Sequence, residues 1–343
     1  MGNTILTKIA AMAGAMLFGA AASAEEMPSG TWNVGHFSTE SWSSSKVDVL
    51  FMKEVEDRTD GALKARFHWA GAMGSGTELL ELTSAGAVDI GSIVPSYYPG
   101  QMPLLSLPSS LPLTWEDPVL ARAVMQGLAR DNEHILSELE RNNVWPILFH
   151  VLPAYRLQCT KPVQTLEDLK GLRVRTFGEW PPQMFQELGA VPVNIAFTEV
   201  YEALQRGSLD CSYLSIEGAG AMKIAEVAKY WSDINLGSFG GYPLFVAKDR
   251  YDSWPEEFRQ VLTDAARVAE DFERSNYQVL EDQTLESVQE AGVELVTFSD
   301  QSKLSEVTSN YLSKWVEAMC DRDLCGEAKD VEADVTEIME KWQ

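Results

Sequence analysis

The chain has 343 residues, and its 27 Lys and Arg residues against 51 Asp and Glu residues give a formal net charge of −24. This acidity excludes a basic nucleic-acid-binding surface for the chain as a whole, so no nucleic-acid partner is expected. With 45% hydrophobic and 23% charged residues the composition is that of a folded protein, and the length predicts about two domains of roughly 150 residues each.

The first 24 residues have the pattern of a cleaved secretory signal peptide. Lys8 precedes an apolar run from Ile9 to Ala22, and the small residues Ala22-Ser23-Ala24 form a cleavage motif. A membrane span needs about 20 strongly apolar residues, which neither this run nor any later segment supplies. A buried N-terminal helix is the alternative for this run. We therefore expect residues 1–24 to be removed and the mature chain to be a soluble periplasmic monomer with no segment inserted in the membrane.

The mature chain opens with alternating strand and helix patterns. Short apolar runs of strand length alternate with stretches of helical periodicity, and Asp60-Gly61 and Gly86 supply the helix stops. The expected strands are residues 31–36, 63–69 and 88–94, and the expected helices are residues 45–59 and 77–85. This β-α-β-α-β order predicts parallel strands with helical crossovers.

The same order recurs after residue 150. The expected strands are residues 172–176, 191–195 and 209–214, and the expected helices are residues 182–188 and 198–205. The two halves share a junction, because Gly86-Ala-Val-Asp89 matches Gly207-Ser-Leu-Asp210, a helix stop followed by an Asp before a strand. We therefore predict two similar α/β lobes.

Residues 253–291 predict one long helix. Ser253 and Glu256 have the spacing of a capping box, and Gly292 supplies the stop. Apolar residues recur at helical spacing between them: Phe258, Val261, Leu262, Ala265, Val268, Ala269, Phe272, Val279 and Leu280. About 38 residues at about 1.5 Å each make a rod of roughly 57 Å, so the helix should run past both lobes. Two helices broken near Ser275 and Asn276 are the alternative.

The four cysteines of an exported chain are candidates for disulfides. Cys320 and Cys325 are close enough in sequence to close a small loop, which leaves Cys159 and Cys211 as the other pair. Four cysteines allow three connectivities, and free buried thiols at Cys159 and Cys211 are a further alternative.

The sequence has none of the usual catalytic or metal-binding motifs. HExxH, CxxC, a Gly-x-Ser-x-Gly elbow and a P-loop are all missing, and the only histidines, His36, His68, His134 and His150, do not have ligand spacing. The run Gly71-Ala-Met-Gly74-Ser-Gly76 does not have the spacing of a dinucleotide loop and is better explained as a helix entry turn. We therefore expect no enzyme activity, no cofactor and no metal. An exported enzyme is the rival hypothesis.

Arginines lie in strand-like segments of this acidic chain. Arg156 lies in the run 155–159, and Arg173 and Arg175 lie two residues apart, so they should share one face of their strand. A carboxylate is the simplest partner for an Arg in such a place, because the guanidinium binds it bidentately. That carboxylate belongs either to the protein, as a structural ion pair, or to a ligand.

An ordered set of motifs resembles the solute-binding proteins of TRAP (tripartite ATP-independent periplasmic) transporters, of the dicarboxylate-binding type. The motifs are Val55-Glu-Asp-Arg-Thr-Asp-Gly61, residues 79–89, Arg156, Lys161-Pro-Val, Leu166-Glu-Asp-Leu-Lys-Gly-Leu-Arg-Val-Arg175, Gly189-Ala-Val-Pro192, Phe197-Thr-Glu-Val-Tyr-Glu-Ala-Leu-Gln205 and Gly207-x-x-Asp210. The long helix fits the family's connecting helix, and the resemblance covers nearly all of the mature chain. An ABC-type or receptor-linked binding protein is the alternative.

The resemblance implies a two-lobed α/β periplasmic-binding-protein fold that closes on a small organic acid and delivers it to membrane permease subunits. On this basis the first lobe comprises residues 25–153 and about 242–285, and the second comprises residues 154–241 and about 286–343. Arg175 matches the family's carboxylate-binding arginine, and Arg156 matches its auxiliary arginine. Arg173 is then expected to be structural.

The chain departs from the family pattern after Asp210, where Cys211-Ser-Tyr-Leu-Ser-Ile216 replaces the usual Gly-Gln-Glu-Asn-Pro. Tyr213 and Ser215 are the expected substitutes for the missing polar contact. Trp180 is expected to stack on the ligand, with a packed loop Trp as the alternative. Further ligand-binding candidates lie at strand ends, at helix starts or in the Gly-rich segment 237–241: His36, Glu78, Ser96, Tyr97 and Phe239.

Overall fold

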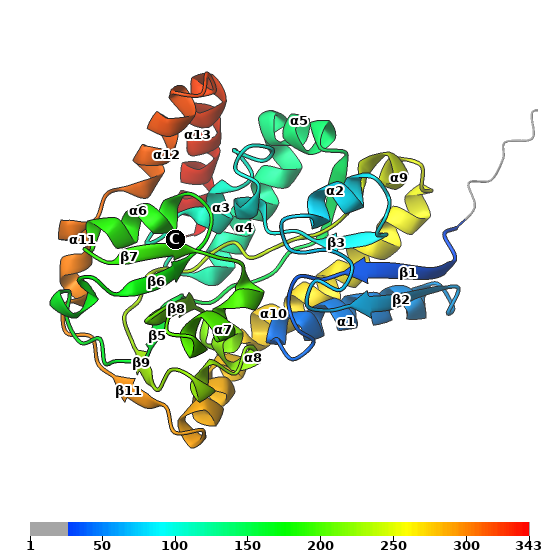
Figure 1. Ribbon diagram of the computed structural model, residues 1–343. Helices are drawn as coiled ribbons and strands as arrows, with labels where there is room; N and C mark the ends of the chain where they lie inside the picture. The colour runs from blue at the N-terminus through cyan, green and yellow to red at the C-terminus, as the bar shows by residue number, and fades with distance from the viewer. Residues whose placement is uncertain (1–26, 343) are drawn as a thin grey trace, which may run out of the picture.

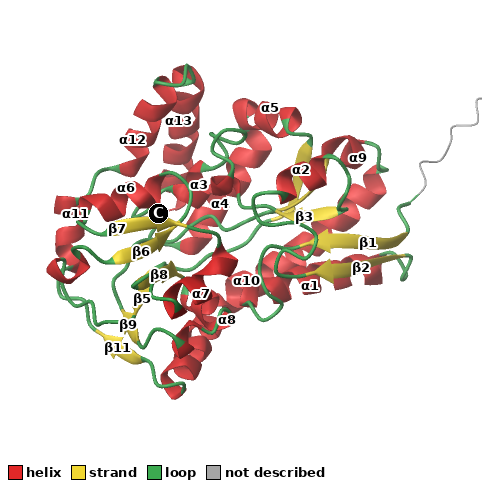
Figure 2. Ribbon diagram, viewed as in Figure 1, coloured by secondary structure: helices red, strands yellow, loops and turns green. Residues whose placement is uncertain are grey.

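The computed structural model describes residues 27–342, so the expected signal peptide, residues 1–24, lies outside the described part of the chain. The molecule has two lobes, each built on one β-sheet with helices packed against it, and one long helix runs along both (Figure 1). Figure 2 shows the two sheets as separate groups of strands. The predicted α/β class and two-lobed architecture are confirmed.

The first sheet has five strands in the order β2-β1-β3-β10-β4. Their bounds are β1 Gly30–Gly35, β2 Leu63–His68, β3 Ile90–Ser92, β4 Val144–Leu148 and β10 Leu244–Ala247. β1 pairs in parallel with β2 and β3, as the sequence pattern predicts. β10 is antiparallel to both of its neighbours, so a strand from much later in the chain lies inside this sheet.

The second sheet has six strands in the order β11-β9-β5-β8-β6-β7. Their bounds are β5 Arg156–Cys159, β6 Arg173–Thr176, β7 Val191–Asn194, β8 Cys211–Leu214, β9 Tyr230–Ser232 and β11 Glu294–Val296. β6 lies between β7 and β8 and is parallel to both, which confirms the second set of predicted crossovers. β5 is antiparallel to β8 and β9.

The helices cover the faces of these sheets and fill the region between them (Figure 1). Before residue 150 they are α1 Ser43–Arg58, α2 Leu79–Ser84, α3 Leu107–Ser110, α4 Pro118–Asp131 and α5 Glu133–Arg141. The next are α6 Trp180–Glu187, α7 Val200–Gln205, α8 Ile216–Ala221 and α9 Lys248–Asp252. The last are α10 Glu256–Glu290, α11 Leu304–Val307, α12 Tyr311–Cys320 and α13 Cys325–Trp342.

Helix α10 is a single unbroken helix of 35 residues. At about 1.5 Å per residue it is about 52 Å long, and the alternative of a break near Ser275 is wrong. Phe258, Leu262 and Ala265 in its first half are buried in one hydrophobic cluster with strands of the first sheet, while Val288 near its end belongs to the other cluster, which contains the strands of the second sheet. The helix therefore joins the two cores.

The predicted capping box at the start of α10 is wrong. The N-cap is Pro255, and Ser253 donates its hydroxyl to the carbonyl oxygen of Arg250 at 2.7 Å, because Ser253 closes the preceding helix α9. Glu256 pairs instead with Arg259 one turn along. The fixed φ of proline, rather than a side-chain hydrogen bond, sets the entry of this helix.

Both predicted disulfides are present, and the alternative of free thiols is wrong. Cys159 and Cys211 lie directly opposite each other on the antiparallel strands β5 and β8. Cys320 ends α12 and Cys325 begins α13, so the second disulfide closes the turn between these helices.

The C-terminal helix α13 packs against α4 and the start of α5. Asn132 donates to Asp334 at 2.8 Å, His134 contacts Asp330 at 3.0 Å, and Gly127 lies against Ile338. The segment 286–343 was expected to belong wholly to the second lobe, but its last helix contacts helices from the segment 25–153. Within the described part of the chain, none of the helices combines the length and hydropathy needed to cross a bilayer.

Candidate ligand-binding cavity

A cavity lies where segments of both predicted lobes meet. The segments predicted for the first lobe supply Phe37, Trp42, Val94, Tyr97, Ser109, Leu152 and Tyr242. The segments predicted for the second lobe supply Tyr155, Arg175, Phe177, Phe197, Phe239 and Gly241. Of the ten residues predicted to bind ligand, Arg175, Tyr97 and Phe239 line it.

Arg175 on strand β6 is the cation of this cavity and is only 1% exposed. It donates through Nη1 to the carbonyl oxygen of Tyr213 at 3.2 Å and through Nη2 to the hydroxyl of Tyr97 at 3.4 Å, and its Nε has no partner. Its guanidinium lies 4.8 Å from the centre of the Phe177 ring. No carboxylate within residues 27–342 forms an ion pair with it, although a buried charge is costly unless it is paired.

Arg173, two residues earlier on the same strand, is satisfied by the protein. Its Nε and Nη2 donate to the two carboxylate oxygens of Asp210 at 2.9 and 2.8 Å. The hydrogen bonds from Arg173 and its charge hold the pKa of Asp210 below its ordinary value, although partial burial opposes this shift. Arg173 is therefore a structural residue, as expected.

Arg156 does not lie in the cavity. It donates to the carbonyl oxygen of Asp233 and lines a separate surface pocket together with Glu281 and Asp282. Its neighbour Tyr155 lines the cavity instead, which follows from the alternation of side chains along an extended chain. The geometry thus gives no support to its predicted role as an auxiliary donor.

Three further candidates from the second lobe are buried beside or behind the cavity lining. Trp180 begins α6 and packs in the core, which is the alternative weighed for it. Ser215 is the N-cap of α8, and its hydroxyl accepts from the backbone N–H of Gly218 at 3.2 Å. Tyr213 supports Arg175 through its carbonyl oxygen, while its own hydroxyl is buried without a partner.

The remaining first-lobe candidates also lie outside the cavity lining. Glu78 is exposed and accepts from the backbone N–H and hydroxyl of Ser75 at 2.8 and 2.7 Å. Ser96 borders a neighbouring groove with Gly178, and its hydroxyl has no partner. His36 is fully buried in a polar network that adjoins the cavity lining at Tyr242.

Most of the aromatic lining residues were missed by the sequence reasoning, which named only Tyr97 and Phe239 among them, although many follow strands. Phe37 follows β1, Tyr97 lies in the turn after β3, Phe177 follows β6 and Phe197 lies in the turn after β7. Ligands of open α/β sheets bind beyond the carboxyl ends of parallel strands. An aromatic residue directly after a predicted parallel strand was therefore a usable signal.

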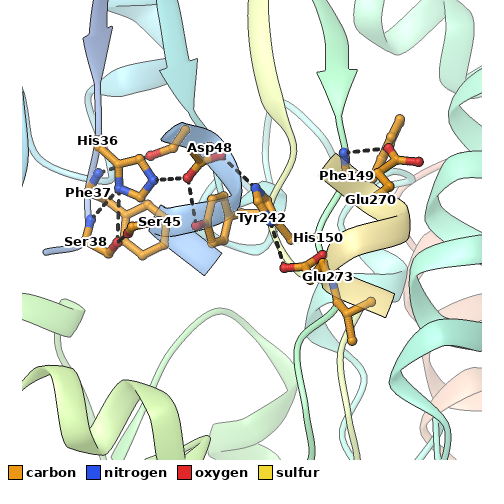
Figure 3. Close-up of polar contacts among 12 residues, drawn as sticks. His36, Phe37, Ser38, Ser45, Asp48, Phe149, His150, Tyr242, Glu270 and Glu273 are labelled. Carbon is orange, nitrogen blue, oxygen red and sulfur yellow. Dashed lines mark hydrogen bonds and ion pairs between the residues drawn. The ribbon is translucent and has the colours of Figure 1, made fainter. Parts of the chain in front are cut away.

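A buried network of charges adjoins the cavity lining at Tyr242 and reaches α10 (Figure 3). His150 contacts Asp48 through Nε2 at 2.9 Å and Glu273 through Nδ1 at 3.0 Å. Glu273 also accepts from the backbone N–H of Val151 at 2.7 Å. The hydroxyl of Tyr242, a lining residue, donates to Asp48 at 3.3 Å. The network therefore connects the cavity wall, α1, the segment after β4 and the middle of α10.

The protonation of the two histidines in this network follows from their partners. The backbone N–H of Ser38 donates to Nδ1 of His36 at 3.0 Å, so the proton of His36 is on Nε2 and points to Asp48. Burial alone lowers the pKa of His150, but Asp48 and Glu273 outweigh burial and raise it to about 10. His150 is thus an imidazolium at neutral pH, donating from both ring nitrogens.

Two α/β lobes around a cavity with one unpaired guanidinium define a solute-binding protein of the two-lobed kind. The family model "Bacterial extracellular solute-binding protein, family 7" (DctP) matches residues 16–318, and the chain belongs to this family. It is a TRAP periplasmic solute-binding protein, which makes it a transport protein and not an enzyme.

Several relatives match most of the chain. It is 26% identical to the 2,3-diketo-L-gulonate-binding periplasmic protein YiaO of Escherichia coli, over 75% of this chain and 77% of the relative. It is 25% identical to the C4-dicarboxylate-binding periplasmic protein DctP of Rhodobacter capsulatus, over 78% of both chains.

Solved structures share the fold. A TRAP periplasmic solute-binding protein of Chromohalobacter salexigens with bound D-glucuronate superposes with a TM-score of 0.77 at 24% identity, covering 90% of this chain and 99% of that one. DctP7 of Bordetella pertussis, which binds pyroglutamic acid, gives 0.76 at 19% identity, covering 88% and 99%.

Proposed function

We propose that this protein captures a small organic acid by its carboxylate on Arg175 and delivers it to the membrane permease subunits of a TRAP transporter. The observation that supports this most is the state of Arg175, which is buried at the cavity with an unpartnered Nε and with no carboxylate of the described chain beside it. A guanidinium offers a planar fork to a carboxylate, and the pair is strongest where water is excluded.

The relatives are consistent with a carboxylate as the shared feature. Diketogulonate, C4-dicarboxylates, glucuronate and pyroglutamate, as named for those proteins, all carry one. The rest of each molecule differs, so their ligands do not point to a dicarboxylate in particular. A second carboxylate would need a second cation, and Arg175 is the only cationic residue among those that line the cavity in residues 27–342. We restrict the proposed function to one carboxylate.

The test is calorimetry with the acid identified by mass spectrometry of material that co-purifies with the protein. Removing one partner of a desolvated charge pair costs about 2–5 kcal/mol, so Arg175→Ala should weaken binding roughly 30-fold to several thousand-fold. Arg175→Lys keeps the charge but loses the fork and should lie between the two.

Arg173→Ala is the matched control, because it removes a guanidinium from the same strand that is already paired with Asp210. It should change affinity little. Near wild-type affinity in a folded Arg175→Ala protein would contradict the proposed function.

A further inference from the structure

The cavity around Arg175 is walled almost entirely by apolar groups. Eight of its thirteen lining residues are aromatic and two are aliphatic, while Asn, Gln, Asp and Glu are missing from the lining in the described part of the chain. In most ligand sites an apolar wall carries a few placed polar groups that fix orientation. Here Arg175 is the only charged group.

The rings form a continuous wall that starts at Arg175. Tyr97 accepts from Arg175 and lies edge-on to Phe37, with ring centres 6.4 Å apart. Phe37 in turn contacts Tyr242 at 4.9 Å and Trp42 at 5.8 Å, both edge-on. Trp42 stacks on Phe197 at 5.0 Å. A ligand held at Arg175 by one end therefore has aromatic faces and edges around its other end.

Three of the four hydroxyl groups of the wall are already engaged, while the fourth, that of Tyr155, forms no hydrogen bond within residues 27–342. The hydroxyl of Tyr97 accepts from Arg175, that of Tyr242 donates to Asp48, and that of Ser109 donates to the carbonyl oxygen of Ser106 at 3.2 Å. The indole N–H of Trp42 and the Nε of Arg175 also have no partner in the described part of the chain. A sugar acid has several hydroxyl groups, and each one that is desolvated here without a partner weakens binding.

A second carboxylate is also disfavoured. It would lie in a low-dielectric region whose aromatic faces carry partial negative charge, with no second cation among the lining residues of the described chain. The enclosed space is also small in this structure. A compact ligand therefore fits it better than an extended one.

We infer that the ligand is a compact monocarboxylate with an apolar ring or branched hydrocarbon as its remainder, of the class of phenylacetate, and not a sugar acid or a dicarboxylate. This inference rests on the proposed function, because it takes the carboxylate to be held by Arg175. It separates this chain from relatives named for hydroxyl-rich acids.

The test is calorimetry on protein freed of co-purified ligand by unfolding in urea and refolding. The probes are benzoate, phenylacetate and 3-methylbutanoate against galacturonate, pyroglutamate and succinate. At least one of the first three should bind more than tenfold more tightly than all of the last three. Tighter binding of a hydroxylated acid or a dicarboxylate, or no binding of any apolar acid, overturns the inference.

Two further measurements distinguish failure of this inference from failure of the proposed function. Phenylacetamide has the same ring without the charge, so it should bind much more weakly than phenylacetate. Arg175→Gln should remove that difference. If galacturonate binds best and Arg175→Gln abolishes its binding, the proposed function stands and the inference falls. If phenylacetate and phenylacetamide bind equally to the unaltered protein, both fall.

A wall variant tests the contribution of the rings. Phe197→Ala removes the partner of Trp42 and should weaken phenylacetate binding at least about tenfold. Phe67→Ala is the matched control, because Phe67 stacks on Trp69 outside the cavity lining. It should leave affinity unchanged. Equal affinities for the unaltered protein and a folded Phe197→Ala protein would exclude the wall as the specificity determinant.

Discussion

His150 is a buried cation whose charge depends on two carboxylates from distant parts of the chain. Asp48 comes from α1 and Glu273 from the middle of α10, and each contacts one ring nitrogen (Figure 3). Arg175 is also a buried cation, but within residues 27–342 it has neutral partners only. The protein thus neutralises one buried cation with its own carboxylates but not the other, within the described residues.

The His150 network makes stability depend on pH in a defined window. The folded protein raises the pKa of His150 from 6.5 to about 10, so it holds one proton more than the unfolded chain between these values. The stability from this proton is fully present below pH 6.5 and is lost as pH rises toward 10, at about 1.4 kcal/mol per pH unit. Burial also raises the pKa of Glu138 to about 7 and that of Glu217 to about 8. The pH dependence of stability that these two carboxyl groups cause therefore ends near pH 8.

We therefore expect the free energy of unfolding to fall between pH 8 and pH 10, and His150→Gln to remove most of this slope. Urea denaturation at several pH values measures it. His134→Gln is the control, because His134 is a surface histidine that contacts Asp330. An unchanged slope in His150→Gln would show that another group causes the pH dependence.

At the scale of single residues, the sequence allowed prediction of Arg175 but not of most of the wall around it. Arginines in strands of an acidic chain stand out, because burial of a charge needs a reason, and the family resemblance singled out Arg175 from Arg173 on the same strand. Phe37, Trp42 and Phe197 do not stand out, since an aromatic residue in a core and one in a ligand wall have the same sequence signature. His36 was predicted as a ligand contact because its buried partner Asp48 was not foreseen.

The two disulfides close loops of very different length. Cys159–Cys211 links strands 52 residues apart in sequence, and Cys320–Cys325 closes a loop of 5. Loop entropy alone then predicts about 4 kcal/mol for the first and about 2 kcal/mol for the second. The Cys159→Ala/Cys211→Ala double variant should therefore lose more stability to urea than Cys320→Ala/Cys325→Ala, which should keep ligand binding. Equal losses, or a larger loss from the second pair, would contradict the loop argument.

At the scale of elements, repeated local patterns were predictable and remote pairings were not. The parallel strands β1, β2 and β3 and the strands β6, β7 and β8 follow from the alternation of strand and helix signals. The insertion of β10 between β3 and β4 does not, because its partners lie about 100 to 150 residues earlier. The packing of α13 on α4 could not be predicted for the same reason, because these helices are also far apart in the sequence.

At the scale of the whole molecule, we expect the lobes to open for a ligand to reach Arg175, which is 1% exposed in the structure. Hinged lobes close around ligands in many binding proteins. Small-angle scattering should therefore give a smaller radius of gyration for the ligand-saturated protein than for the ligand-free one. Arg175→Ala at the same ligand concentration should not compact. Identical radii with and without saturating ligand would instead support a rigid cavity with another entrance.

The attachment of α10 at its middle has a mechanical consequence for such motion. Glu273 lies midway between the ends of the helix at Glu256 and Glu290, and it is tied there to His150 and to the backbone of Val151. A stiff rod held at its centre acts as a lever with two equal arms. With arms of about 26 Å, a tilt of about ten degrees at this fulcrum would move each tip by roughly 4–5 Å, in opposite directions. A small displacement of the His150 network would thus move the two ends of the helix in opposite directions.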